Sequence, residues 1–166
     1  IIKEKSGQYA NNKLDNKWTY WADDGRKTQE ISYDKGIKHG PFLQWNVDNY
    51  KVTDGEYNQG EKHNKWALWY EDGTLKQHES YFNGEKDGQW IWWRPDGVKD
   101  REGSYKDDVK HGIWTQWNNA DHKNLEETFV NGVIDGKITI WYDNGNKDRE
   151  GVIRNNEQEG IWHYFY

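Results

Sequence analysis

The chain repeats itself every 24 residues from one end to the other, and this period constrains its fold more than any other feature. One column of the repeat is mostly tyrosine, and two tryptophan-rich columns follow it nine and twelve residues later. The three columns are Tyr9, Tyr33, Tyr57, Tyr81, Tyr105, Phe129 and Ile153; Trp18, Phe42, Trp66, Trp90, Trp114, Ile138 and Trp162; and Trp21, Trp45, Trp69, Trp93, Trp117, Trp141 and Phe165. No insertion or deletion interrupts them. We therefore expect a single repeat domain over residues 1–166, with repeats at approximately 6–29, 30–53, 54–77, 78–101, 102–125, 126–149 and 150–166.

Three other columns hold only Gly, Asn or Asp, the residues that best tolerate a left-handed backbone. They are Asn12, Gly36, Gly60, Gly84, Asp108, Gly132 and Asn156; Asn16, Gly40, Asn64, Gly88, Gly112, Gly136 and Gly160; and Gly25, Asn49, Gly73, Gly97, Asp121 and Gly145. Several belong to Asn-Gly and Asp-Gly dipeptides, which are typical of tight hairpin turns. We predict turns at all three columns, with positive φ at the second.

The segments between these columns have the composition of strands. Residues 66–70 and 77–82 are typical, since aromatic and β-branched side chains favour a pleated surface. Tight hairpins make neighbouring strands antiparallel, and so many strands twist and curl when they share a sheet. The sequence therefore predicts an all-β fold, in which seven 24-residue hairpin repeats and about 14 strands form one long, curved and twisted antiparallel sheet.

Charge and composition exclude several classes of protein. A net charge of −6 does not suit a nucleic-acid-binding protein, which needs a basic surface. The longest stretch without Asp, Glu, Lys or Arg is residues 111–120, too short for a membrane-spanning helix. The chain has no Cys, which removes disulfides and thiol chemistry. Cytoplasmic and bacterial cell-envelope or secreted locations are both compatible with this composition. Because residue 1 is Ile, we expect a processing site or a further segment ahead of it.

The candidate catalytic and metal-binding residues all recur at fixed positions of the 24-residue repeat. Ser32, Ser80 and Ser104 share one column, which indicates a solvated strand face rather than a nucleophile. His39, His63 and His111 share another, but copies two strands apart are separated by roughly 10 Å, too far to share one metal ion easily. A third column holds carboxylates, which could take part in acid–base catalysis. A lysine precedes each of these acids by three residues, however, and this spacing favours ion pairs on the surface. The acids are Glu30, Asp54, Glu102, Glu126 and Glu150. We predict no enzyme activity, no metal and no cofactor.

Residues 79–97 carry a pattern that resembles the MORN repeat (membrane occupation and recognition nexus), and more closely its Trp-rich bacterial variant. The shared elements are an aromatic residue, Asn-Gly, Lys-Asp-Gly, Trp-x-x-Trp and Asp-Gly, and they recur along the whole chain. The resemblance implies β-hairpins in a long sheet with stacked aromatic residues. Bacterial relatives are often labelled antitoxin-like, which implies binding and neutralisation of a partner. Two departures, Trp at the column headed by Trp18 and the acidic charge, move this chain away from lipid binding. The chain also resembles choline-binding cell-wall repeats, but more weakly, because the period of those repeats is shorter.

The aromatic columns are the one feature of the sequence that indicates a binding surface. Most of their members are expected to form the core, because stacked Tyr and Trp replace an aliphatic interior. The two tryptophan columns are three residues apart, however, and side chains alternate faces with a period of two. Either a bulge brings both columns to one face, or one column lines a partly exposed groove. We predict the second case, with the exposed column centred on Trp45, Trp69, Trp93 and Trp117.

The predicted function is a non-catalytic repeat scaffold for protein–protein interaction, including antitoxin-like neutralisation of a partner. Repeat arrays present extended surfaces, and an acidic chain favours a basic protein partner. The alternative is a carbohydrate-binding module of the bacterial cell envelope, in which tryptophan faces stack against sugar rings.

Overall fold

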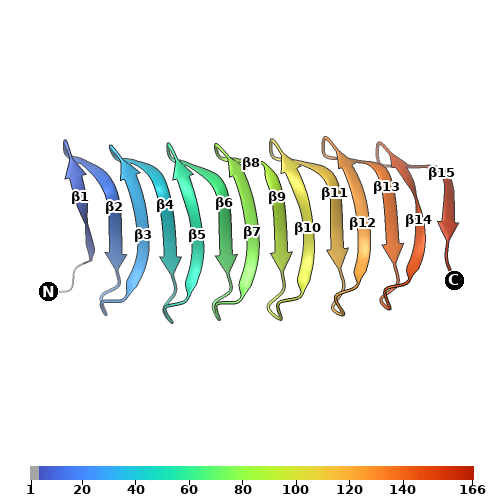
Figure 1. Ribbon diagram of the computed structural model, residues 1–166, viewed down its shortest axis with the longest axis horizontal. Coiled ribbons are helices and arrows are strands. Elements are labelled where there is room, and N and C mark those ends of the chain that lie inside the picture. Colours follow the sequence, from blue (N-terminus) through green and yellow to red (C-terminus); the bar gives the residue numbers. More distant parts are fainter. Residues whose placement is uncertain (1–3) are drawn as a thin grey trace. The chain divides into compact units, whose positions relative to one another are not determined.

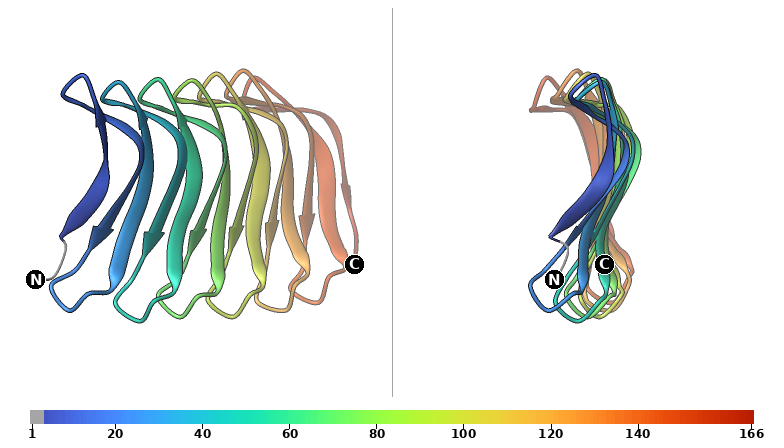
Figure 2. Two further views of the ribbon diagram at one scale, coloured as in Figure 1. Left: turned by 60° about the vertical axis from the view of Figure 1, so that its left-hand side comes forward. Right: turned by 90° about the vertical axis from the view of Figure 1, so that its left-hand side faces the viewer.

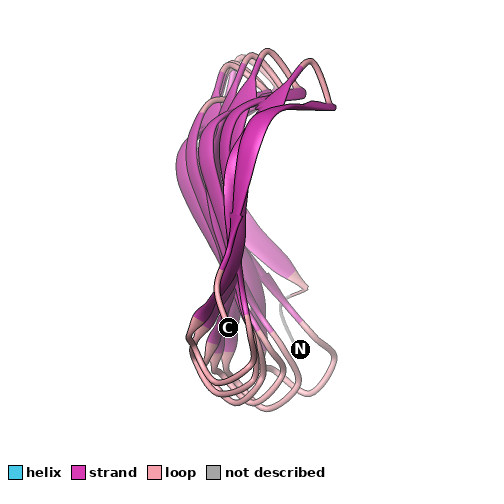
Figure 3. Cartoon of the chain, turned by 90° about the vertical axis from the view of Figure 1, so that its right-hand side faces the viewer, coloured by secondary structure: helices cyan, strands magenta, loops and turns pink. Residues whose placement is uncertain are grey.

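The computed structural model describes residues 4–166, and this part of the chain contains strands and turns but no helix (Figures 1 and 3). It divides into two compact units, Ile1–Glu85 and Lys86–Tyr166. The predicted all-β fold of antiparallel hairpin repeats is confirmed. The assignment of the whole chain to one domain stays a prediction, and we describe each unit by itself.

The first unit is an antiparallel meander in which hydrogen-bonded neighbours follow the order of the sequence. Each of β2 to β6 pairs with the strand before it and the strand after it, and Figure 2 shows that the strands bend along their length. Its strands are β1 (Lys5–Ala10), β2 (Lys13–Trp21), β3 (Lys27–Asp34), β4 (Ile37–Trp45), β5 (Lys51–Asn58), β6 (Glu61–Trp69) and β7 (Leu75–Phe82).

The second unit repeats this meander. Its strands are β9 (Gly88–Trp93), β10 (Lys99–Lys106), β11 (Val109–Trp117), β12 (Lys123–Val130), β13 (Val133–Trp141), β14 (Lys147–Arg154) and β15 (Glu157–Tyr164). A two-residue strand, β8 (Glu85–Lys86), precedes β9 and is separated from it by Asp87. This break explains why fifteen strands are present where about 14 were expected.

The first Gly/Asn/Asp column forms two-residue hairpin turns. Both central residues have positive φ in each of them, for example 47° at Asn83 and 89° at Gly84. Positive φ at both positions defines the type I′ turn, whose twist matches that of the flanking strands. Lys35 and Gln59 also adopt this conformation, because the glycine that follows each of them completes the turn.

The third column closes five-residue loops at the other ends of the strands. In the loop between β6 and β7, the Gly73 amide donates to the Tyr70 carbonyl and the Tyr70 amide to the Thr74 carbonyl. The Asp72 carboxylate accepts a hydrogen bond from the Thr74 amide at 2.9 Å, as short polar side chains do in turns.

The second column has the predicted positive φ but is not a turn. Asn16, Asn64, Gly88, Gly112 and Gly136 have φ of 56°, 57°, 96°, 74° and 142°, so that prediction is confirmed. Most of the column lies inside or at the start of strands, however, where the ladder is irregular. In β6, residues 64–66 lie opposite the single residue Gly55 of β5. Such a bulge needs a left-handed residue just as a turn does, which is why the sequence pattern alone suggested a turn.

We expect Gly88→Val to destabilise the second unit by about 1–3 kcal/mol, because a β-branched residue is strained at a φ of 96°. Denaturant unfolding of the variant and the parent chain measures this loss. Asn64→Gly, at the same column, is the control and should leave stability nearly unchanged. An equally stable Gly88→Val variant would contradict the assignment of the column to left-handed geometry.

The bulge also places the core tryptophans. The Trp66 indole lies over Gly55, and its Nε1 donates to the Glu56 carbonyl at 3.1 Å. Trp18 and Trp114 repeat this arrangement over Gly7 and Gly103. Because a tryptophan ring lies over each of these glycines, no side chain fits there. Glycine occupies every second copy of this repeat position, 48 residues apart, and the copies between hold larger side chains. The whole column is Gly7, Ile31, Gly55, Glu79, Gly103, Glu127 and Gly151.

Candidate binding surface

The two tryptophan columns lie on opposite faces of the strands. The register shift beside Trp69 places its extra residue, Lys76, on β7, so side chains alternate regularly along β6 and separate Trp66 from Trp69. Trp66 packs against Phe42 and Tyr57, with ring centroids 5.6 Å and 5.0 Å away, and is only 2% exposed. The face that carries the Trp66 column is therefore the core face, as expected.

The face that carries the Trp45 column is more open. Trp45 and Trp69 in the first unit are half-buried, and so are Trp93 and Trp117 in the second. Trp66 and Trp90, by contrast, are buried. The sequence therefore ranked the exposure of the two columns correctly. A role for the four residues in binding stays a prediction.

A lysine lies over most of these exposed tryptophans, which the sequence analysis did not foresee. In the first unit, Lys51 Nζ lies 4.7 Å from the Trp69 ring centroid, and Lys27 Nζ lies 5.2 Å from that of Trp45. In the second unit, Lys99 Nζ lies 4.6 Å from the Trp117 ring. These are cation–π distances. Lys51, for example, lies on β5 between Trp45 of β4, which it pairs with, and Trp69 of β6, which it covers. Tryptophan and lysine therefore alternate from strand to strand within each unit.

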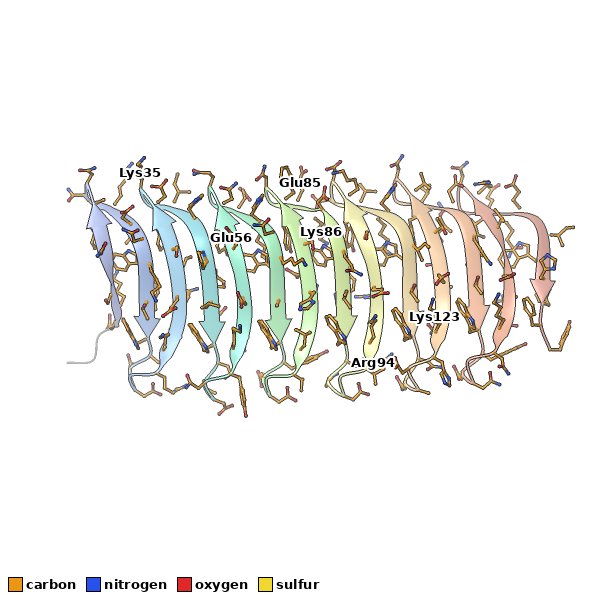
Figure 4. The ribbon with its side chains drawn as sticks, in the orientation of Figure 1. Lys35, Glu56, Glu85, Lys86, Arg94 and Lys123 are labelled. Carbon is orange, nitrogen blue, oxygen red and sulfur yellow. The ribbon has the colours of Figure 1, made fainter. Side chains whose placement is uncertain are left out.

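The same lysines hold the column of carboxylates. Lys51 Nζ lies 2.7 Å from Asp54, and Lys99 Nζ lies 3.0 Å from Glu102. A bulge residue between them, Val52 in the first case, brings side chains three apart to the same face. The predicted surface ion pairs are thus present. We call the surface formed by the Trp45, Lys51 and Asp54 columns the ladder face; Figure 4 labels one member, Lys123 of β12.

Glu30 has the most enclosed carboxylate among these pairs. It accepts hydrogen bonds from Lys27 Nζ at 2.7 Å and Lys17 Nζ at 3.4 Å. The hydrogen bond from Lys27, supported by that from Lys17, lowers the pKa of Glu30 below its ordinary value of 4.5. Two lysines, Lys147 and Lys137, lower the pKa of Glu150 in the second unit in the same way.

This shift predicts a small pH dependence of stability. Because the pKa of Glu30 is lower in the folded state, its contribution is present above about pH 4.5 and is lost as the pH falls through the folded value. We expect Glu30→Gln to lower the unfolding free energy at pH 7 by less than about 1 kcal/mol and to have a smaller effect at pH 2.5. Chemical unfolding of both chains at the two pH values checks this. A loss that is the same at both pH values would contradict it.

The histidines of the predicted turn column, His39, His63 and His111, lie within strands β4, β6 and β11. The His63 Nδ1 accepts a hydrogen bond at 3.3 Å from the amide of Asn83, which lies in the turn after β7. Within residues 4–166, no group of three or more His, Asp or Glu side chains could hold a metal ion. The same residues contain no helix long and apolar enough to cross a membrane.

The second unit also contains a hollow of about 540 Å³ at the end where its five-residue loops lie. It is bordered by polar groups and one tryptophan, among them Arg94, Asp100, Trp117, Asn119, Asn124 and Asp143. Figure 4 shows Arg94 where β9 runs into its loop. The sequence analysis missed this site. Its only signal is that the column of Asp100 and Asn124 holds Asp or Asn here, whereas the first unit has Thr28, Val52 and Lys76 at these positions.

No protein-family model matches the chain. No curated protein sequence matches it significantly either. The likeness to MORN repeats therefore remains a resemblance.

Proposed function

We propose that the chain is a non-catalytic binding scaffold whose ladder face contacts a protein partner. The observation that carries this proposal is the half-burial of the Trp45 column beside paired lysines and carboxylates. Tryptophan is enriched among the residues that contribute most to protein interfaces, and a surrounding polar rim excludes water from them.

The lysines favour a protein over a stacked sugar. A sugar ring that stacks on tryptophan needs one face of the indole to be free. Lys51 lies over Trp69, and Lys99 over Trp117, so each ring already has a cation at its face. A protein partner instead uses the mixed surface as it stands, with apolar contacts at the indole edges and ion pairs at the rim. The net charge of −6 favours a basic partner.

The antitoxin-like form of this function follows from the resemblance to bacterial MORN-variant repeats. It requires that the bound partner be a toxic protein that is silenced in the complex. Co-expression of the chain with its captured partner tests this form, since relief of growth inhibition is expected.

A capture experiment tests the proposed surface. The intact chain and the double variant Trp45→Ala/Trp69→Ala are immobilised and exposed to extract from the source cells. We expect the double variant to lose the partner that the parent chain retains. The matched control is Tyr9→Ala/Phe82→Ala, which removes two aromatic side chains of the same unit that are 61% and 59% exposed and lie outside the Trp45 column.

Thermal unfolding of both double variants confirms that they are folded before capture is compared. A partner retained equally by both variants would place the interface elsewhere. Binding to a glycan array that is lost only in Trp45→Ala/Trp69→Ala would favour the carbohydrate-binding alternative instead.

A further inference from the structure

The hollow of the second unit is built around Arg94, whose guanidinium is held in place by the chain. Its Nη2 donates to the carbonyls of Trp117, Asn118 and Lys99, at 2.6, 3.0 and 3.1 Å. Its Nη1 donates to Asn119 Oδ1 at 3.1 Å. Four hydrogen bonds from two nitrogens make Arg94 a rigid part of the wall rather than a mobile surface charge.

Two polar atoms in this wall have no hydrogen-bond partner. Arg94 Nε is buried and lies 3.9 Å from Asp100 Oδ1, beyond hydrogen-bond distance. Asn124 Oδ1 is also buried and unpartnered. One of these atoms is a donor and the other an acceptor, and each carries a desolvation penalty while it stays unpaired. The terminal torsion of Asn124 is soft, so a small rotation turns its amide oxygen toward the hollow.

The charge of the lining selects the kind of ligand. Among its residues, Arg94 is positive while Asp100 and Asp143 are negative, which leaves a net charge of −1 and disfavours an anion. Arg94 in the wall disfavours a cation. Both unpaired atoms are covered in this structure, so a ligand reaches them only after the Asn124 side chain has turned. A hydroxyl group then suits both, because it accepts from a donor such as Nε and donates to an acceptor such as Oδ1.

The rest of the lining suits a molecule with several hydroxyls. Gln116, Asn118 and Asn119 supply amides and the two aspartates supply acceptors. Trp117 supplies an apolar ring edge, since Lys99 lies over its face. A volume of about 540 Å³ lies within the range of small-molecule sites. We propose that this hollow binds a neutral pyranose, either as a free sugar or as the terminal unit of a glycan. The hollow shares Trp117 with the ladder face, but the capture experiment replaces only Trp45 and Trp69 of the first unit, so the failure of one proposal can be told from the failure of the other.

The experiment follows the Arg94 Nε–H signal by NMR in the ¹⁵N-labelled intact chain. Glucose, galactose, mannose and N-acetylglucosamine are added in turn, with glucuronic acid and methylguanidinium as charged probes. We expect at least one neutral sugar to shift the Arg94 signal saturably, and both charged probes to bind more weakly. A trisaccharide that binds more tightly than its own monosaccharide identifies a glycan as the source, and equal affinity identifies the free sugar.

Asn124→Ala should weaken sugar binding about tenfold, because it removes one of the two groups that the hydroxyl satisfies. Thr28→Ala, at the same repeat position in the first unit, is the matched control and should bind as the parent chain does. Trp117→Phe keeps an aromatic surface and should weaken binding less than Asn124→Ala.

Three results would overturn the proposal. The first is an Arg94 signal that no neutral sugar shifts, with an ordered water as the only occupant of the hollow. The second is sugar binding that Asn124→Ala leaves unchanged although the variant is folded. The third is tighter binding of methylguanidinium than of any sugar, which would assign the hollow to a basic side chain.

Discussion

Gly55→Ala is expected to destabilise the first unit by about 3 kcal/mol, because a Cβ at this position would lie 2.1 Å from Trp66 Cδ2. Trp66 is 2% exposed and its Nε1 is tied to the Glu56 carbonyl, so the indole cannot move aside without losing that hydrogen bond. Denaturant unfolding monitored by tryptophan fluorescence measures the loss.

A rescue variant separates this clash from the backbone cost of replacing glycine. The equivalent pair one repeat earlier is Ile31 with Phe42, so Gly55→Ile/Trp66→Phe should recover most of the stability lost in Gly55→Ala. Gly25→Ala is the control for backbone strain alone. Its φ is 86° and an added Cβ meets nothing within 4 Å, so it should cost about 1 kcal/mol. Similar losses in Gly25→Ala and Gly55→Ala would show that the close approach of Trp66 is not what requires glycine.

Lys62→Met is expected to lower the stability of the first unit by about 2–3 kcal/mol. Lys62 Nζ lies 3.0 Å from Glu79 Oε2 and 4.5 Å from the Trp66 ring, on the core face. Glu79 is only 7% exposed, so removal of the lysine leaves a buried carboxylate without its cation. The remaining hydrogen bond from Gln77 compensates only in part.

Lys38→Met is the matched control for Lys62→Met. Lys38 occupies the same column and lies 4.8 Å from the Tyr57 ring, but the position equivalent to Glu79 is Gly55, which has no carboxylate. The control should cost under about 1 kcal/mol. Adding Glu79→Gln to Lys62→Met should restore part of the stability, since it neutralises the stranded charge. Equal losses in the two lysine variants would mean that the ion pair with Glu79 contributes nothing.

The sequence predicted much of this architecture because the repeat multiplies weak signals. A single Asn-Gly pair is a modest indication of a hairpin, but a column of Gly, Asn and Asp at one period is a strong one. The same columns led to one error, since Asn64 and its equivalents lie in bulges rather than turns. Both structures need positive φ, and φ alone does not say whether the chain reverses.

The candidate site was predictable only in part. Alternation along β6 already placed Trp66 and Trp69 on opposite faces, and the spacing of Lys51 and Asp54 suggested an ion pair. The lysines over most of the half-buried tryptophans were not predicted, because their positions depend on which residues of neighbouring strands are in register. The hollow around Arg94 was not predicted for a similar reason, since its wall combines residues from several loops and strands.

The sequence by itself determined the period, the hairpins and the positions that must be left-handed, because these depend on local backbone preferences and on side-chain alternation. It also contained the 48-residue recurrence of Gly7, Gly55, Gly103 and Gly151. The structure explains this recurrence, because a tryptophan ring lies over each of these glycines and leaves no room for a side chain. The tertiary structure decided which tryptophan column is buried. Trp66 is covered because Tyr57 from the adjacent strand and Lys62 from its own strand close over it, whereas Trp69 has Lys51 over its ring and stays half-buried. Burial depends on the side chains that neighbouring strands bring into contact, and the bulges that set this register act across strands rather than along the sequence.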